Sequence, residues 1–328
     1  MQSDAYKIVQ LTNGTYSIRS LAERETFHPV IGPIAEAEAL YVKQLKLRER
    51  LAKHSGEFVI WDVGLGAAAN VLTILRETKE ISSNVRIISF DHKIAPLEFA
   101  VNHAENLGYF SGYETPVRKL IENGRIEFPN GKQMVNWKFH LGDFPRWLAG
   151  VAAGILPAVE PGVPPRGKDL AYSKRVKNFH QSPGGWMPSS TSGEMPDATF
   201  AAPHAILFDA FSPAKNPAMW TLPLFTNLFC LLDPQKPCAM PTYSRATMLR
   251  VTLLLAGFFV GVGHATGEKE ETTIAANTME LLDEPLEKKW LERVRNSKSA
   301  EPMHQPVYEQ KFISPESWER LNNHPQFR

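Results

Sequence analysis

Residues 58–70 read Phe58-Val-Ile-Trp-Asp-Val-Gly-Leu-Gly-Ala-Ala-Ala-Asn70, and this stretch decides the fold. Its apolar run predicts a buried strand, its two glycines a sharp turn, and the small apolar residues after them the start of a helix. Glycine suits Gly64 and Gly66 because the backbone must turn tightly there and pass close to a ligand. The stretch therefore predicts the entrance to a nucleotide-type site on an open α/β sheet, with Asp62 where the strand ends.

The spacing of the glycines distinguishes between two kinds of nucleotide site. A dinucleotide-binding turn has the pattern G-x-G-x-x-G and holds a pyrophosphate at the helix N-terminus. This chain has D-x-G-x-G from Asp62 to Gly66. That pattern is typical of the strand-turn-helix with which a methyltransferase contacts the methionyl and ribose parts of S-adenosylmethionine. The motif is short, so the rest of the chain must support it.

Apolar runs alternate with helical patterns along most of the chain, which predicts a mainly parallel sheet with helices on both faces. About seven strands are expected, at Phe58–Asp62, Val85–Phe90, Val135–Leu141, Ala205–Asp209, Cys238–Tyr243, Phe258–Gly263 and Thr272–Ala276. Helices are expected over residues 67–78, 94–107, 218–231 and 246–256. The last two strands are expected to add an antiparallel pair. The predicted fold class is therefore α/β and Rossmann-like.

The chain divides into three predicted parts. Residues 1–57 are expected to form an N-terminal extension, with a hairpin closed by an Asn13-Gly14 turn and a helix over 34–53. Residues 58–280 form the main domain, interrupted at 155–204 by an insertion rich in proline and glycine. Residues 281–328 are expected to contain one amphipathic helix, from Leu281 to Val294, and a polar tail.

Composition narrows the class of protein. The formal net charge is +1, so a nucleic acid would have to be bound by a local basic patch. The spacing of Cys230 and Cys238 matches no common zinc site, and we expect reduced structural thiols in a cytoplasmic protein without a bound metal. No apolar run reaches the roughly 18 residues of a membrane span. The first residues also lack the pattern of a signal peptide.

Four acidic residues fall where predicted strands end. They are Asp62, Asp91, Asp143 and Asp209. A carboxylate at Asp91 can accept hydrogen bonds from both ribose hydroxyls, and one at Asp143 can accept from the exocyclic amine of adenine. Each of the four could instead cap a helix. Because all four lie in register at the ligand-binding edge of the sheet, ligand binding is favoured.

The fourth strand delivers Asp209 into an irregular loop that reads Asp209-Ala-Phe-Ser-Pro-Ala-Lys-Asn-Pro-Ala-Met-Trp220. Pro213 and Pro217 stiffen this loop, which helps to hold a substrate in place for attack. Methyl transfer to an amine requires positioning and a group that receives the departing proton. Asp209 can bind the amine and accept that proton, although a rigid connection capped by Asp209 is the alternative.

The loop from Asp209 to Trp220 is similar to the signature of the methyltransferase half of the bifunctional tRNA 5-methylaminomethyl-2-thiouridine biosynthesis enzymes and of their standalone bacterial forms. Other segments fall in the matching order: Glu25-Thr-Phe-His28, Gly32-Pro-Ile-Ala-Glu-Ala-Glu38, Leu141-Gly-Asp143, Thr242-Tyr-Ser244 and Ala256-Gly-Phe258. The resemblance covers about residues 12–276, apart from the insertion.

The resemblance implies a class I S-adenosylmethionine-dependent methyltransferase that methylates the 5-aminomethyl group of a wobble (2-thio)uridine in tRNA. Asp209 would be the catalytic residue that faces the amine. The implied cofactor-binding residues are Asp62, Gly64, Gly66, Asp91, Asp143 and Glu25. The implied substrate-binding residues are His28, Phe211, Ser212, Pro213, Lys215 and Asn216.

The resemblance implies tRNA as a partner, and one local patch suits that partner. Its cations are Arg166, Lys168, Lys174, Arg175 and Lys177, and Tyr172 and Phe179 lie among them. Cations interleaved with aromatic rings can contact phosphates and stack on splayed bases. A solvated loop is the alternative. No second glycine-rich loop marks the oxidase half, so a separate FAD-dependent oxidoreductase acting upstream is the other implied partner.

The sequence departs from the family pattern at two points. Gly66-Ala-Ala68 stands where G-x-G-T-G is usual, and Gly267-Glu-Lys-Glu-Glu271 stands where the family has a basic stretch. Glutamates repel a polyanion, which favours an alternative acceptor, namely a small-molecule or protein amine. A nonenzymatic cofactor-binding protein of the same fold is the second alternative.

Overall fold

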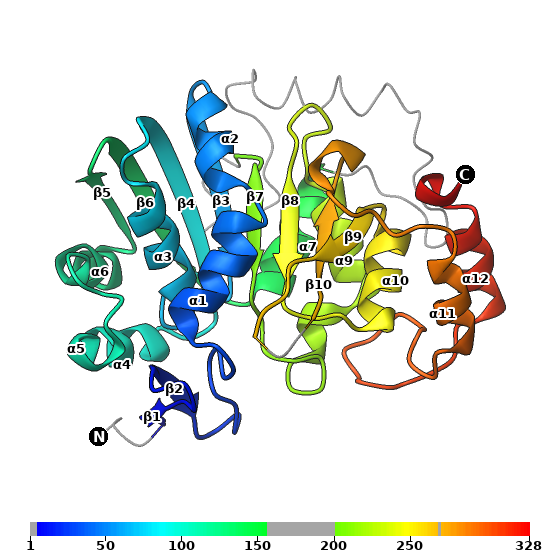
Figure 1. Ribbon diagram of the computed structural model, residues 1–328, viewed down its shortest axis with the longest axis horizontal. Helices are drawn as coiled ribbons and strands as arrows, with labels where there is room; N and C mark the ends of the chain where they lie inside the picture. The colour runs from blue at the N-terminus through cyan, green and yellow to red at the C-terminus, as the bar shows by residue number, and fades with distance from the viewer. Residues whose placement is uncertain (1–4, 156–200, 268–269) are drawn as a thin grey trace, which may run out of the picture.

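The computed structural model describes residues 5–155, 201–267 and 270–328. Its centre is an eight-stranded sheet with the order β5-β6-β4-β3-β7-β8-β10-β9 (Figure 1). The strands are β3 (Glu57–Val63), β4 (Ser83–Asp91), β5 (Arg125–Asn130), β6 (Gln133–Leu141), β7 (Ala205–Phe208), β8 (Ala239–Thr242), β9 (Phe259–Gly263) and β10 (Thr272–Ala276). The five strands from β6 to β8 pair in parallel, and this confirms the α/β fold class.

The order of the strands reverses beside β3. The chain passes from β3 outward to β4 and β6, and then returns to place β7 on the other side of β3. At such a reversal the loops after neighbouring strands diverge and leave a crevice at the carboxyl ends of the strands. The glycine turn after β3 and the loop after β7 therefore share the position where a ligand is expected.

Helices cover both faces of the sheet, as expected (Figure 1). One face carries α1 (Pro33–Ala37), η1 (Glu38–Lys43), α2 (Leu47–Lys53), α3 (Ala69–Thr78), α4 (Ala95–Asn102), α5 (Ala104–Leu107) and α6 (Glu114–Asn123). The other face carries α7 (Phe144–Ile155), α9 (Leu222–Cys230), α10 (Thr247–Ala256), α11 (Trp290–Asn296) and α12 (Pro315–Asn322). Alternation along β3 supplies both cores, because Ile60 packs on the first face and Trp61 on the second.

The predicted N-terminal hairpin is confirmed. It consists of β1 (Tyr6–Gln10) and β2 (Tyr16–Ser20), and Gly14 has φ 84° in the connecting turn. The chain after β2 remains attached to it, because the Phe27 N–H donates to the Ile18 carbonyl at 2.8 Å. The hairpin thus anchors the segment that leads to His28.

The structure differs from the predicted elements at two places in the first half of the chain. The sheet has eight strands where about seven were expected, because residues 125–130 form an unpredicted edge strand, β5, in a hairpin with β6. The single helix expected over 34–53 is divided into α1, a π-helix (η1) and α2. The division lies at Lys46, which has φ 50° and so cannot continue a right-handed helix. Both η1 and α1 pack on α3, so these residues belong to the main core.

The helix expected from Leu281 to Val294 is also wrong in extent. Only Trp290–Asn296 is α-helical, after a 3₁₀ turn at Met279–Leu281. The residues between them pair with β9 instead: the Val262 N–H donates to Glu284 O at 2.8 Å, and the Leu286 N–H donates to Val260 O at 2.9 Å. Pro285 lacks an N–H and fits this irregular pairing better than a helix interior.

The end of the chain covers the same outer strand. The side-chain amide of Gln326 donates to Val260 O at 2.7 Å, and its oxygen accepts from the Val260 N–H at 2.8 Å. One side chain thus makes both bonds that a neighbouring strand would make to Val260. Within residues 5–155, 201–267 and 270–328, no helix is long and apolar enough to cross a membrane.

Candidate functional site

The glycine turn after β3 fits closely against the end of β7. Gly64 has φ 96°, and a Cβ there would lie 2.6 Å from the backbone oxygen of Asp209. Gly66 has φ 50°, and its Cβ would lie 3.2 Å from the ring of Phe27. Both conformations favour glycine. The turn therefore leaves no space for larger residues between β3, the loop after β7 and the segment before α1.

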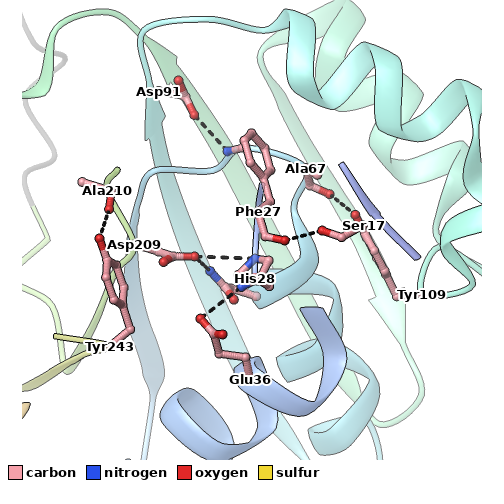
Figure 2. Close-up of polar contacts among 12 residues, drawn as sticks. Ser17, Phe27, His28, Glu36, Ala67, Asp91, Tyr109, Asp209, Ala210 and Tyr243 are labelled. Atoms are coloured by element: carbon pink, nitrogen blue, oxygen red, sulfur yellow. Dashed lines mark hydrogen bonds and ion pairs between the residues drawn. The ribbon is translucent and has the colours of Figure 1, made fainter. Parts of the chain in front are cut away.

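Asp91 at the end of β4 is fixed by the same turn. Its carboxylate accepts a hydrogen bond from the Gly66 N–H at 2.9 Å (Figure 2). It accepts another from the Lys93 N–H at 3.1 Å. The side chain is partly exposed, and each oxygen has a further lone pair. Asp91 is therefore oriented to accept hydroxyl donors from a ligand that lies over the glycine turn.

Asp209 lies at the centre of a polar cluster (Figure 2). Asn70, in the first turn of α3, donates from Nδ2 to Asp209 Oδ2 at 2.8 Å. The Nε2 atom of His28 lies 3.6 Å from the same oxygen, and its Nδ1 atom lies 3.4 Å from Oε1 of Glu36 in α1. The side chain of Asp209 retains 16% of its exposure, while His28 and Glu36 retain 9% each. Asp209 is therefore the member of this cluster most accessible to a substrate.

The two carboxylates determine the charge of His28. Burial alone would lower the pKa of His28, but Asp209 and Glu36 outweigh this effect and raise the pKa to about 9. His28 is therefore an imidazolium at neutral pH. The cluster of Glu36, His28 and Asp209 thus places this cation between two acidic side chains.

Asp62 lies inside the sheet rather than on its exposed edge. Its side chain is buried within β3 and accepts from Ser89 Oγ at 2.7 Å, and Ser89 accepts in turn from Trp137 Nε1 at 2.9 Å. Burial raises the pKa of Asp62 to about 7, despite the Ser89 hydrogen bond, and Asp209 and Asp91 contribute to the rise. Asp62 therefore lies below the site and acts on it through charge.

The loop after β7 is held by hydrogen bonds at successive residues. The Tyr243 hydroxyl donates to Ala210 O at 3.0 Å, and Trp220 Nε1 donates to Phe211 O at 2.8 Å. Ser212 Oγ donates to Glu25 Oε1 at 2.7 Å, which joins this loop to the segment before α1. The structure thus brings Glu25, Phe211 and Ser212 together with Asp209.

Three other predicted residues lie toward the outside of the site. Pro213 is partly exposed, Lys215 is exposed and Asn216 is partly exposed, in a turn where the N–H groups of residues 215 and 216 both donate to Ser212 O at 2.8 Å. They are available to a substrate, but no contact in the structure assigns them a role.

Asp143 caps a helix, which is the alternative that the sequence left open. It is exposed after β6, and its Oδ1 accepts from the Arg146 N–H at 2.8 Å in the first turn of α7. A capping carboxylate keeps a free lone pair. The contact with adenine remains a prediction.

The residues present fit S-adenosylmethionine. The cofactor carries ribose hydroxyls that need acceptors, and the site offers the carboxylate of Asp91 beside the glycine turn. Two buried polar atoms in the same region, Asn70 Oδ1 and the Tyr41 hydroxyl, have no hydrogen-bond partner among the described residues. An unsatisfied buried polar group costs about 1–3 kcal/mol, so a polar ligand or water is expected to complete the site.

Sequence reasoning missed four members of the site: Glu36, Tyr41, Asn70 and Tyr243. Glu36 and Tyr243 lie inside segments that support the family resemblance, and Asn70 ends the stretch that decides the fold. A glutamate among the apolar residues of a predicted helix was the available signal for Glu36. Nothing in the sequence indicates that the Tyr41 hydroxyl faces the site.

The acidic stretch that departs from the family pattern is partly neutralised. Oε1 of Glu271 lies 3.5 Å from the buried guanidinium of Arg250 in α10 and 3.4 Å from that of Arg293 in α11. Glu271 is therefore an internal partner of two arginines. The basic patch predicted from Arg166 to Lys177 lies outside the described residues.

Comparisons with known proteins agree with this geometry. A family model described as S-adenosyl-L-methionine-dependent methyltransferase matches residues 194–278. The tRNA 5-methylaminomethyl-2-thiouridine biosynthesis bifunctional protein MnmC of Campylobacter concisus is 22% identical over 262 residues, covering 80% of this chain and 34% of that protein. The protein of the same name from Ectopseudomonas mendocina is 43% identical over 67 residues, covering 20% of this chain and 10% of that protein.

The fold is shared with a solved structure. MnmC2 of Aquifex aeolicus superposes with a TM-score of 0.60 at 19% identity, covering 98% of this chain and 84% of that chain. The chain itself spans about a third of the length of the Campylobacter relative. The matches confirm the resemblance that the sequence indicates, the methyltransferase fold, and S-adenosylmethionine as the cofactor that this fold and the family model imply.

Proposed function

We propose that this chain is an S-adenosylmethionine-dependent N-methyltransferase that methylates the 5-aminomethyl group of a wobble (2-thio)uridine in tRNA. The observation that carries the proposal is the Asp209 carboxylate, which is accessible at the reversal of strand order and held by Asn70 at 2.8 Å. It lies in the loop that resembles the tRNA-modifying family most closely, within the residues that the methyltransferase family model matches.

In this mechanism Asp209 accepts a hydrogen bond from the amine of the substrate and takes up its departing proton. The bound cofactor supplies an electrophilic methyl group on a sulfonium. Asp91 would bind the ribose hydroxyls and so fix the cofactor relative to the amine. Glu25 and Ser212, which are hydrogen-bonded at 2.7 Å, would hold the loop that positions the substrate.

Two observations support tRNA as the acceptor. The curated relatives carry tRNA modification in their names, and the charge of Glu271 is balanced by Arg250 and Arg293. This pairing weakens the argument for a different acceptor that the acidic stretch first suggested. The patch from Arg166 to Lys177 would supply phosphate contacts, and a separate FAD-dependent oxidoreductase would act upstream. A tRNA substrate would be encountered in the cytoplasm.

The test is a transfer assay with labelled S-adenosylmethionine and tRNA from cells that lack the methylation of aminomethyl-uridine. We expect a methylaminomethyl-uridine peak when the nucleosides are separated by mass spectrometry. Asp209→Asn should lower turnover by about 100-fold or more while leaving cofactor affinity within about twofold. Asp283→Asn, which changes an exposed aspartate paired with Lys46, is the matched control and should retain full turnover.

Cofactor binding without transfer to any tRNA would reject the proposed substrate. It would favour the alternatives, a small-molecule or protein amine or a nonenzymatic cofactor-binding protein. Salt dependence separates tRNA from the smaller acceptors, because several phosphate contacts give a steep fall of substrate affinity with ionic strength. A flat dependence from about 50 to 200 mM salt would contradict tRNA as the acceptor.

A further inference from the structure

We propose that His28 is a positioning residue for Asp209: clamped as a cation between Glu36 and Asp209, it orients the Asp209 carboxylate and limits the negative charge that faces the substrate amine. This inference rests on the proposed function and differs from the role expected from sequence, in which His28 itself binds substrate. It also assigns a role to Glu36, which lies in α1 and would act only through His28.

The backbone of His28 adopts an unfavourable conformation that neighbouring hydrogen bonds must stabilise. His28 has φ 47°, a left-handed conformation that is uncommon for residues other than glycine. The preceding residue, Phe27, is hydrogen-bonded to β2 through both of its backbone groups. Its N–H donates to Ile18 O. Its carbonyl accepts from Ser17 Oγ (Figure 2). This anchoring directs the imidazole between Glu36 and Asp209.

The contacts of the ring also indicate a clamp. Figure 2 shows Glu36 and Asp209 at opposite nitrogens of His28, at 3.4 Å and 3.6 Å. With 9% of its side chain exposed, His28 offers little surface to a substrate, whereas Asp209 offers more. Asn70 holds the same Asp209 oxygen from α3. The Asn70 amide and the His28 imidazole therefore both lie against Oδ2 and fix the orientation of the carboxylate.

The charges around His28 come from several elements. Glu36 and Asp209 face it directly, from α1 and from the loop after β7. Asp62 in β3 and the hydroxyls of Tyr41 and Tyr243 lie in the same electrostatic neighbourhood of Asp209. Of these groups, only His28 is a cation.

The cation matters because an amine attacks the methyl group only when it is neutral. The substrate ammonium first loses a proton to water. Its nitrogen lone pair then forms the new C–N bond, while the C–S bond breaks and its electron pair stays on sulfur. The methylated nitrogen is then a cation, and Asp209 takes up the proton that it loses. Negative charge near the amine stabilises the ammonium form and so raises the pH at which the amine becomes reactive. His28 offsets part of that negative charge.

The first experiment measures the charge of His28 in the free protein, without substrate. Proton–carbon NMR of histidine-labelled protein would follow each imidazole from pH 5 to 10, and the signal absent from His28→Gln identifies His28. We expect His28 to titrate near pH 9, and Glu36→Gln and Asp209→Asn each to lower that midpoint by about one unit or more. A midpoint near 6.5 in the wild type would overturn the proposal.

The second experiment compares the pH profiles of kcat for methyl transfer at saturating tRNA, because kcat reports the groups that titrate in the enzyme–substrate complex. His28→Gln removes the cation, so the acid limb should move to higher pH by about one unit, with kcat about 10- to 100-fold lower. Glu36→Gln removes a negative charge, so the acid limb should move to lower pH. A purely structural role predicts lower activity in both variants without opposite shifts of the limb, and that result would overturn the proposal.

Controls separate this inference from the proposed function. His304 forms another histidine–glutamate pair, 3.9 Å from Glu301 on the C-terminal segment, and His304→Gln should leave both profiles unchanged. Calorimetry should give the same cofactor affinity for all variants within about twofold. If the wild type fails to methylate tRNA, the proposed function is rejected. The NMR titration alone then tests whether His28 is held as a cation between Glu36 and Asp209.

Discussion

Gly64 shows how a single residue couples the glycine turn after β3 to the loop after β7. Its φ of 96° and the 2.6 Å between its ideal Cβ position and Asp209 O impose two separate constraints on the residue. Gly64→Ala should lower the free energy of unfolding by about 2–4 kcal/mol, combining backbone strain and a clash with backbone atoms. Urea unfolding measures this loss.

Gly108 provides the matched control. It has φ 75° at the end of α5, but a Cβ there would meet nothing within 4 Å. Gly108→Ala should therefore lose only the strain, about 1 kcal/mol. Equal losses for the two variants would show that the close approach of Gly64 to Asp209 contributes nothing.

Asp91 is predicted to contribute to cofactor affinity. Asp91→Ala removes the acceptor for the Gly66 N–H and the proposed acceptor for the ribose hydroxyls. We expect S-adenosylmethionine to bind about 10- to 100-fold more weakly by calorimetry, which is the loss of hydrogen bonds to a charged group. A loss below twofold would contradict the ribose assignment.

The sequence predicted the site residues at the ends of strands better than the residues that pack around them. Gly64, Asp91 and Asp209 could be found because each follows a recognisable strand. Asn70 and Glu36 could not, because their role depends on which helices the sheet order brings beside Asp209. A contact between residues 28, 36 and 209 is a property of the tertiary fold and leaves no periodic pattern in the chain.

At the scale of elements, α10 is joined to the β9–β10 hairpin through one buried cation. Arg250 Nε donates to Thr273 Oγ1 at 3.0 Å, its Nη2 donates to Thr272 O at 2.7 Å, and its Nη1 faces Glu271. Arg250→Gln should reduce the free energy of unfolding by about 3 kcal/mol, since it breaks a buried pair on one side only.

Arg293 pairs with the same carboxylate oxygen but is half exposed. Solvent screening makes such a pair worth at most about 1 kcal/mol, so Arg293→Gln should have a small effect in the same denaturation experiment. A large effect for Arg293 and a small one for Arg250 would reverse this assignment of the two arginines.

The elements that the sequence did not predict lie at the two edges of the sheet. The strand β5 lies at an edge of the sheet and carries Pro129, and its sequence Arg-Ile-Glu-Phe-Pro-Asn lacks the continuous apolar run of a central strand. The segment between Leu281 and Trp290 has helical spacing, but its residues 284–286 hydrogen-bond to the outer edge of β9 instead. Central strands such as β3 and β4 were predicted correctly because burial on both faces gives continuous apolar runs.

For the whole molecule, buried groups with shifted pKa values contribute to the response of stability to pH, and His28 and Asp62 are two of them. The pKa of His28 is about 9 in the folded protein and 6.5 for an unperturbed imidazole, so its stabilising contribution is complete below 6.5 and is lost as the pH rises through 9. The pKa of Asp62 is about 7 against 3.8, so folding retains a proton that the unfolded chain releases, and stability falls from about pH 4 to 7.

Both effects therefore lower stability as the pH rises. Their full sizes are about 3 kcal/mol for His28 and about 4 kcal/mol for Asp62. His204 and His324 act in the opposite direction below about pH 6.5, because burial lowers the pKa of each to about 4. Urea unfolding at pH 7.5 and 9, above their titration, should therefore show a decline in the wild type, and His28→Gln should flatten it. Asp62→Asn should change the slope between pH 4 and 7 relative to the wild type. A wild-type stability that rises between pH 7.5 and 9 would contradict the assignment of His28.

The cover over β9 has a consequence for how copies of this chain behave together in solution. An open outer strand offers free N–H and carbonyl groups to the sheet of another molecule, and so promotes aggregation. Residues 284–286 and Gln326 occupy those groups on β9. Gln326→Ala should therefore increase light scattering on mild heating before the far-ultraviolet signal changes, whereas Arg328→Ala should not. The 3₁₀ turn Pro325–Phe327, which carries Gln326, is thus expected to prevent β9 of one molecule from pairing with the sheet of another.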